Sequence, residues 1–326
     1  MATARSIIQK VASWRWVVPT LVVAGLLFAL LADYRPILNG YIQFVLITIG
    51  INIILCASLN LVNGYMGEFS VGHAGFMSLG AYASAVFTTK WMPDNAVAFF
   101  PSVVFAGLVA ACVGFLLALL SFKTRGDYLA IITLAFLMIV KSAFENIPYV
   151  GGPRGLLGID KSTTLAWTFF WVVVTLWVIR NLVYSKFGRA ITAIREDEIA
   201  ANAMGVRTRE AKIIAFVVSS FFGGVAGALF AHQLQFINPS TFDIVKSTEI
   251  LVMVYLGGIA SLGGSILGAV IFTVLSQVLQ PLGTWRMVIL PLLLVLLMLF
   301  RPRGIMGMKE LTWFLPKNEL DPTRKP

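Results

Sequence analysis

Charged side chains are scarce in this chain. Lys, Arg, Asp and Glu make up 12% of its 326 residues, whereas a soluble globular domain carries about 25%. Hydrophobic residues make up 58% of the chain, and its mean hydropathy is +0.87. Apolar runs recur at about 20 residues, the length that an α-helix needs to cross a hydrocarbon layer about 30 Å thick. The composition therefore excludes a soluble globular domain and indicates a polytopic membrane protein.

Reactive and metal-binding side chains are also scarce. The two cysteines, Cys56 and Cys112, lie inside apolar runs and are interpreted as small packing residues. The two histidines are widely separated, and neither an HExxH motif nor a GxxxxGK[ST] phosphate-binding loop occurs. These absences predict a chain that is not an enzyme, holds no metal and binds no cofactor of its own.

The apolar runs predict an all-α fold, a transmembrane helix bundle of eight to ten spans. No long series of alternating ten-residue strands suggests a barrel. We expect a single transmembrane domain over residues 17–300, between a cytoplasmic N-terminus at 1–16 and a cytoplasmic tail at 301–326. The predicted runs lie at 17–33, 37–62, 69–90, 98–121, 128–147, 165–184, 212–236, 248–281 and 286–300.

The run 248–281 is too long for one crossing. Its residues would extend about 51 Å as one helix, at 1.5 Å per residue. We therefore expect two short legs or a re-entrant hairpin, whose irregular backbone is buried in protein or lines a cavity. The glycines that allow the chain to turn back are Gly257, Gly258, Gly263, Gly264 and Gly268.

The net charge of +10 does not indicate nucleic-acid binding. The basic residues form short clusters at the ends of apolar runs, a pattern typical of cytoplasmic loops in membrane proteins. Counting spans from a cytoplasmic N-terminus places the segment 186–212 inside the cell. The same count places the loops 148–164 and 237–247 outside.

The segment 186–212 is the most charged part of the chain. It contains six basic and four acidic residues, too many to enter hydrocarbon at a cost of a few kcal/mol each. It is also too short to be a domain. A membrane protein that holds such a segment at the bilayer surface is expected to offer it to a soluble partner.

Two interpretations of this segment stay open on periodicity alone. In the first, residues 188–205 form a short amphipathic helix that a glycine precedes and another glycine ends. Ile191 and Ile194 then share one face, and Arg195 and Glu198 share another. In the second, the segment is an ordinary solvated loop whose basic residues only fix orientation.

The region 63–85 is unusually rich in small residues for a membrane span. Small side chains recur every fourth position, at Ser70, Ala74 and Ser78. This spacing lets one helix face approach a neighbouring backbone closely. Either the helix lines a translocation route, with Glu68 and His73 near its cytoplasmic half, or it packs closely around a hydrogen-bonded histidine.

Lys141 and Glu145 stand one turn apart on the expected helix 128–147. Paired charges within membranes tend to face the interior of a bundle, so these two residues are candidates for a gate. Alternatively, they mark the outer membrane interface, where long side chains reach for water.

Several ordered motifs resemble the inner-membrane permeases of branched-chain amino acid ABC importers, specifically the longer of the two permease subunits. The resemblance covers about residues 45–308. Its landmarks are Gly67, Ser70, Gly72-His73-Ala74, Phe76, Gly80-Ala81-Tyr82, Thr133-Leu134, Phe136, Gly151-Gly152, Gly155-Leu156, Gly188-Arg189-Ala190, Ala193-Ile194-Arg195-Glu196-Asp197-Glu198, Gly205, Gly257-Gly258, Gly263, Gly268-Ala269, Arg301-Pro302 and Gly304.

The resemblance implies a role for the segment 188–205, which would dock on a cytoplasmic ATPase and pass its motion to the pore. It also implies a second permease subunit, two cytoplasmic ABC ATPases that use ATP, an external substrate-binding protein and a bacterial-type inner membrane. The coupling candidates are Gly188, Arg189, Arg195, Glu196, Asp197, Glu198 and Gly205. The candidates for the translocation pathway are Gly67, Glu68, Ser70, Gly72, His73, Phe76, Tyr82, Lys141 and Glu145.

Two residues depart from the pattern of this family. Glu68 stands where the family usually carries Gln, and Val150 stands where Thr is frequent. Substrate choice or gating can therefore differ from transport of leucine, isoleucine and valine, since the family also includes importers of urea, amides and other amino acids. The alternative function is an ion-coupled secondary transporter of a small polar solute. That alternative is thinly supported, because Glu145 is the only acidic residue deep within a confident span.

Overall fold

The computed structural model describes residues 22–34, 39–93, 98–122 and 128–285, with scattered residues between 288 and 310. The expected cytoplasmic N-terminus at 1–16 lies outside these residues, as does most of the expected tail at 301–326.

Helices form almost all of the described chain. A helix at Val22–Tyr34 comes first. The α-helices that follow are α2 (Gly40–Asn60), α3 (His73–Val86), α4 (Phe99–Ser121), α5 (Tyr128–Asn146), α6 (Leu165–Val183), α7 (Lys186–Glu196), α8 (Glu198–Ala203), α9 (Thr208–Leu234), α10 (Ile244–Gly257) and α11 (Leu262–Val278). The shorter helices are η1 (Leu61–Met66), η2 (Phe87–Trp91), η4 (Pro148–Val150), η5 (Gly152–Arg154), η6 (Pro239–Thr241) and η7 (Gln280–Trp285). Two short strands, β1 (Leu156–Leu157) and β2 (Phe236–Ile237), form one antiparallel pair.

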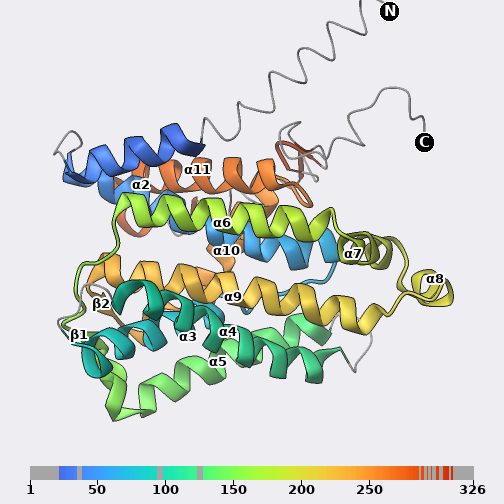
Figure 1. Ribbon diagram of the computed structural model, residues 1–326, viewed down its shortest axis with the longest axis horizontal. Coiled ribbons are helices and arrows are strands. Elements are labelled where there is room, and N and C mark those ends of the chain that lie inside the picture. The colour runs from blue at the N-terminus through green and yellow to red at the C-terminus, as the bar shows by residue number, and fades with distance from the viewer. Residues whose placement is uncertain are drawn as a thin grey trace, which may run out of the picture.

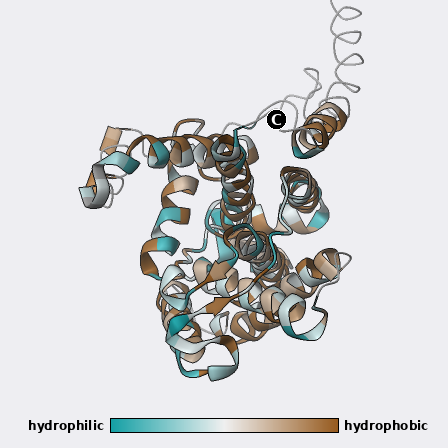
Figure 2. Cartoon of the chain, turned by 90° about the vertical axis from the view of Figure 1, so that its left-hand side faces the viewer, coloured by the Kyte–Doolittle hydropathy of each residue, from teal (hydrophilic) through white to brown (hydrophobic). Residues whose placement is uncertain are grey.

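The all-α membrane fold is confirmed. Among the described residues, five helices are long and apolar enough to cross a membrane: α2 with η1, α4, α5, α6 and α9. The helix at Val22–Tyr34 and α11 are shorter apolar helices, and the total number of crossings stays a prediction. Most helices run along the long axis, with α7 and α8 at one end and the β1–β2 pair at the other (Figure 1). Viewed along this axis, the helices are mainly hydrophobic (Figure 2).

Helix α9 packs in the centre of the bundle through small residues. A Cβ on Gly80 of α3 would lie 2.1 Å from the carbonyl oxygen of Gly224 in α9. A Cβ on Gly227 would lie 1.9 Å from the carbonyl oxygen of Met77. Small residues drive membrane helices together in this way, because backbones that touch gain van der Waals contact. Close packing therefore accounts for the small residues of the region 63–85.

The prediction of a helix from residue 69 is wrong. Met66 ends the helix formed by α2 and η1, and Gly67 takes φ +77°, a left-handed backbone that favours glycine. Residues 67–72 are not helical, and α3 begins only at His73. We call residues 67–72 the first break.

The prediction that the run 248–281 is interrupted is confirmed. Helix α10 ends at Gly257, α11 begins at Leu262, and Gly258 lies between them at φ +133°. We call residues 258–261 the second break. A Cβ on Gly257 would lie 1.9 Å from the carbonyl oxygen of Gly264, so the expected glycines also allow the two legs to pack closely.

The second break lies against η1, the helix that ends just before the first break, because a Cβ on Gly64 would lie 2.4 Å from the backbone nitrogen of Ala260. Backbone groups at membrane depth need partners inside the protein, since hydrocarbon supplies none. Side chains from other helices satisfy this need at both breaks, as described below.

Candidate functional site

Helices α7 and α8 form the charged end of the molecule (Figure 1). The first of the two open interpretations, a helix over 188–205, is correct in type, but the segment forms two helices. Asp197 divides them, because it adopts extended backbone, with φ −160° and ψ 111°. Its carboxylate caps α8 by accepting hydrogen bonds from the backbone nitrogens of Ile199, at 2.8 Å, and Ala200, at 3.0 Å. Asp197 thus ends one helix and starts the next, which is a typical capping role for Asp.

Gly188 and Gly205 were expected to stand before and after the coupling helix, and only Gly205 lies at a helix end. Gly188 lies inside α7, whose N-terminus is capped by Ser185 through a 3.3 Å bond from the Gly188 nitrogen. A Cβ on Gly188 would lie 1.8 Å from the carbonyl oxygen of Val183, so this glycine lets α7 turn tightly away from α6. Gly205 follows α8 at φ +83°, as expected for a helix-ending residue.

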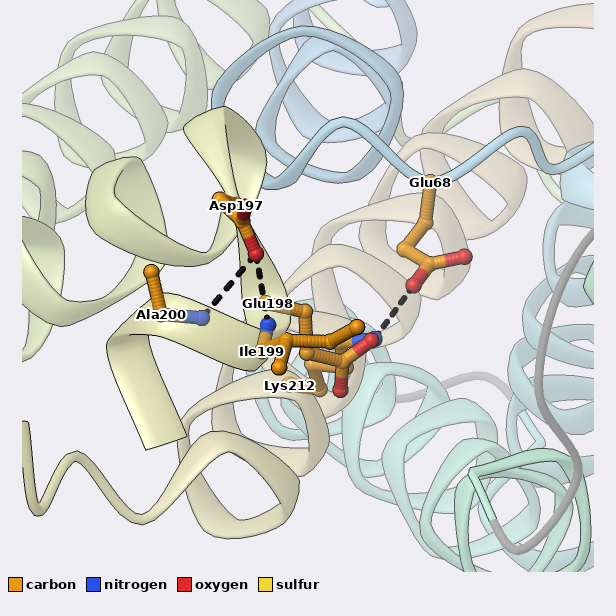
Figure 3. Close-up of polar contacts among 6 residues, drawn as sticks. All are labelled: Glu68, Asp197, Glu198, Ile199, Ala200 and Lys212. Carbon is orange, nitrogen blue, oxygen red and sulfur yellow. Dashed lines mark hydrogen bonds and ion pairs between the residues drawn. The ribbon is translucent and has the colours of Figure 1, made fainter. Parts of the chain in front are cut away.

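An ion triad connects the charged end to the first break. The Lys212 ammonium lies 2.5 Å from a carboxylate oxygen of Glu68 and 2.8 Å from one of Glu198. Figure 3 shows the two carboxylates approaching Lys212 from separate elements, the first break and α8. Lys212 itself is buried at 5% exposure, and its Nζ lies 5.7 Å from the centre of the Phe122 ring. A buried cation of this kind depends on its partners.

A second contact joins the charged end to the first break, this time through α7. A Cβ on Gly67 would lie 2.6 Å from Cγ of Arg195, so the backbone of the first break lies against the end of α7. The Arg195 guanidinium is held by Glu196, at 2.7 Å between Nη2 and a carboxylate oxygen. Arg189, in contrast, is exposed. The structure therefore brings together Glu68, Arg195 and Glu198, which the sequence analysis assigned to two separate roles.

Several translocation candidates lie in the packed core. His73 is 2% exposed, and its Nε2 lies 2.8 Å from the hydroxyl oxygen of Ser58. Ser70, Gly72, Phe76 and Tyr82 are also buried. In this conformation they are part of the packed interior, and a part in the translocation pathway stays a prediction for them.

Aromatic rings fill the space around these residues. The Phe76 ring lies 4.8 Å, centre to centre, from Phe136, and the Tyr82 ring stacks at 4.1 Å on Phe144. A cavity of about 810 Å³ lies elsewhere, between the helix Val22–Tyr34, α2 and α6, and its walls are mainly apolar. The packing favours the interpretation of His73 as a hydrogen-bonded core histidine.

The structure pairs Lys141 with Asp243 instead of with Glu145. The Lys141 ammonium lies 3.0 Å from a carboxylate oxygen of Asp243, which precedes α10. The backbone N–H of Ile244 and the Lys141 ammonium hold the pKa of the Asp243 carboxyl below its usual value, so Asp243 carries its negative charge. Glu145, one turn beyond Lys141, is partly exposed.

The sequence analysis missed the charged residues of α10. Lys246 and Glu249 are 3.1 Å apart, and their side chains are 20% and 27% exposed. Their spacing of three residues on a helix was visible in the sequence, but the expected span began between them. Together with Lys141 and Asp243 they form what we call the polar face, on α5 and α10. These helices flank the first break, since Thr133 of α5 and Ser247 of α10 both bond the backbone of Val71.

Other surfaces of the bundle differ sharply from the polar face. Helices α4 and α11 contain no charged residue. They expose large apolar side chains, among them Leu108, Phe115 and Leu120 on α4 and Ile271, Val274 and Val278 on α11. Lipid hydrocarbon can cover such apolar surfaces without a free-energy cost, whereas covering the partly exposed charges of the polar face is costly. The polar face is therefore the side of the chain on which water or another protein is required.

Comparison with known proteins agrees with this architecture. Residues 41–300 match the family model described as the branched-chain amino acid transport system permease component. The chain belongs to this family.

Named relatives cover most of the chain. It is 34% identical to the high-affinity branched-chain amino acid transport system permease protein LivM of Escherichia coli K12, over 79% of this chain and 68% of that protein. It is 25% identical to a probable LivM of Methanocaldococcus jannaschii, over 73% of this chain and 81% of that protein. The permease protein LivH of Escherichia coli K12 is 29% identical over 46% of this chain and 50% of its own length. No solved structure matches this chain.

Family membership settles the class of the protein. It is a pore-forming permease subunit and a multi-pass membrane protein, and its relatives are transport subunits rather than enzymes. The resemblance to the longer permease subunit is thereby confirmed. The alternative of an ion-coupled secondary transporter is not favoured.

Proposed function

We propose that this chain is the membrane subunit of an ATP-driven importer of branched-chain or related amino acids. It works in a bacterial-type inner membrane with both termini in the cytoplasm. The proposal is carried by the charged end of the molecule, which lies outside the membrane spans. The chain belongs to the permease family and has no phosphate-binding loop of its own, so the charged end is suited to contact a separate ATPase. Two cytoplasmic ABC ATPases bind and hydrolyse ATP, and this chain binds no cofactor.

The charged end carries apolar side chains suited to a protein contact. Ile199 and Met204 in and after α8 are 82% and 85% exposed, and Phe187 on α7 is 53% exposed. Large apolar side chains that project from a charged surface are typical anchors at protein interfaces. We assign this surface to the ATPase, which moves α7 and α8 when it binds ATP.

A second, homologous permease subunit covers the polar face. The named relatives include both LivM and LivH proteins, whose names refer to the same kind of transport system. The charges of α5 and α10 are costly toward lipid but acceptable beside a water-filled route. The route therefore runs between the two permeases, and not through the packed core of this chain around His73.

Substrate choice follows mainly from an external binding protein that docks on the outer loops. Glu68, the departure from the family pattern, is engaged by Lys212. The Glu68 carboxylate is paired with Lys212 near the charged end in this conformation, so the presence of Glu68 does not argue for an unusual substrate. The branched-chain amino acids are accordingly the first substrates to test.

The proposal is tested by reconstitution. The chain is expressed with its ATPases and second permease, purified in mild detergent, and placed in liposomes with the binding protein. We expect uptake of leucine, isoleucine or valine that requires ATP on the side of the charged end. Uptake that follows a proton or sodium gradient without ATP would overturn the proposal.

A matched pair of variants tests the docking surface. Ile199→Asp should abolish co-purification of the ATPase while the permease still inserts, because a charge replaces an apolar anchor. Leu157→Asp, at the opposite end of the molecule and 71% exposed, should leave co-purification unchanged. Equal retention of the ATPase by both variants would place the contact elsewhere.

A further inference from the structure

We propose that Lys212 transmits the movement of α8 to the first break, by dividing its charge between Glu198 and Glu68. This inference rests on the proposed function, because it requires a partner that moves α8. It goes further by naming the residues that connect the docking surface to the interior of the permease.

The two carboxylates that bind Lys212 differ in their exposure to water. Both carboxylates lie within 2.8 Å of the Lys212 ammonium. The Glu198 side chain is 50% exposed, whereas the Glu68 side chain is 22% exposed and Lys212 is almost fully buried. Water can therefore replace Lys212 around Glu198. It cannot easily replace both partners of Lys212, because a buried cation without a counter-charge is strongly unfavourable.

The two partners belong to elements that can move. Glu198 is the first residue of α8, and the cap formed by Asp197 fixes its position relative to the docking surface. Glu68 belongs to the first break, whose residues are not helical, and its backbone nitrogen bonds the carbonyl of Val62 in η1. The break can therefore shift without unwinding a helix. Lys212 lies on α9, the central helix of the bundle. The ion triad thus joins two mobile elements to a fixed one (Figure 3).

A displacement of α8 therefore has a defined consequence. Glu198 leaves Lys212 for water, and Glu68 becomes the sole counter-charge of the buried ammonium. The full attraction of Lys212 then draws the first break toward α9. The backbone of Val71 in the first break bonds Thr133 of α5 and Ser247 of α10, so the shift reaches the polar face beside the proposed route.

The test measures the first break directly. Phe69 is 43% exposed, and Phe69→Cys in a Cys112→Ser background gives a thiol whose rate of maleimide labelling reports on the break. The buried Cys56 stays in place. In the assembled transporter, the labelling rate should change at least threefold between the nucleotide-free state and the state trapped with ATP and vanadate.

Glu198→Gln should abolish this change, because it weakens the link to α8 but leaves Lys212 paired with Glu68. It should also lower amino acid uptake at least tenfold, while the ATPase still co-purifies and hydrolyses ATP. The control is Glu210→Gln, which removes an exposed partner of Arg207 on the same helix as Lys212. The control should keep both the labelling change and the uptake within twofold of the unmodified transporter.

A labelling change of the same size in Glu198→Gln would overturn the role of Lys212. That result differs from a failure of the proposed function. If the function itself is wrong, the unmodified chain shows no ATP-driven uptake and no labelling change that depends on nucleotide.

Discussion

The two breaks are held in different ways. The second break is anchored by Asn60, which is fully buried in α2 and accepts a hydrogen bond from Ala260 at 3.0 Å. Asn60 also donates to the carbonyl of Ser261 at 2.9 Å and to the hydroxyl of Ser265 at 2.8 Å. Glu310 accepts from the first two backbone nitrogens of α11, at 2.8 and 2.9 Å.

The first break is held both by hydrogen bonds and by a shared charge. Asn63 accepts from the backbone nitrogen of Ser70 at 3.1 Å, and Thr133 accepts from that of Val71 at 3.1 Å. Asn63 also donates to the carbonyl of Ser70, and Ser247 donates to that of Val71. The charged tie is the ion pair of Glu68 with Lys212, an ammonium that Glu198 shares. The strength of this tie depends on the position of Glu198, whereas Asn60 and Glu310 bond the backbone at the second break directly, so we expect the first break to be the one that moves.

The largest expected effect comes from replacing Asn60, which anchors the second break. Asn60→Leu leaves the backbone groups of Ala260 and Ser261 without partners in an apolar interior. Each such group costs about 1–3 kcal/mol, so we expect a loss of roughly 3–5 kcal/mol in stability. Thermal unfolding of the purified protein in detergent measures this loss.

The matched variant at the first break is Asn63→Leu. It frees the backbone N–H and carbonyl of Ser70, whereas Asn60 also bonds the hydroxyl of Ser265, so a lower cost of about 2–4 kcal/mol is expected. If Asn63→Leu unfolded the protein at a lower temperature than Asn60→Leu, the first break would be the more firmly held of the two, contrary to the comparison.

The smallest expected effect concerns Glu68 itself. Glu68→Gln keeps an oxygen that accepts a hydrogen bond from Lys212, and Glu198 still neutralises the ammonium. Stability should therefore change by less than about 1 kcal/mol, while uptake per ATP hydrolysed falls severalfold because the charge is no longer shared. Parallel assays of uptake and ATP hydrolysis in liposomes give this ratio. An unchanged ratio would show that the charge of Glu68 plays no part in coupling.

The sequence was sufficient for the parts of the fold that depend on composition. Long apolar runs identified the five longest helices, and the glycines around 257–268 identified the second break. A gap was expected between the runs 37–62 and 69–90, but it was placed too early. The helix continues to Met66, and the left-handed backbone at Gly67 begins the break at residues 67–72.

The site depends on contacts that no local pattern contains. Glu68 and Lys212 are 144 positions apart in the chain, so their pairing arises only from the packing of the first break against α9. Asp197 was assigned to partner docking through the family resemblance, whereas the structure uses its carboxylate to cap α8. Lys246 and Glu249 were not singled out, although their helical spacing already allowed an ion pair.

In the proposed function, the charged end faces the cytosol and is covered by the ATPase. Ala200 on α8 is exposed, and Ala200→Cys in a Cys112→Ser background keeps the Asp197 cap, which uses only the backbone at residue 200. An impermeant maleimide should label this thiol in inside-out vesicles that lack the ATPase and should label it far more slowly once the ATPase is bound. Labelling from the exterior of intact cells would contradict the account.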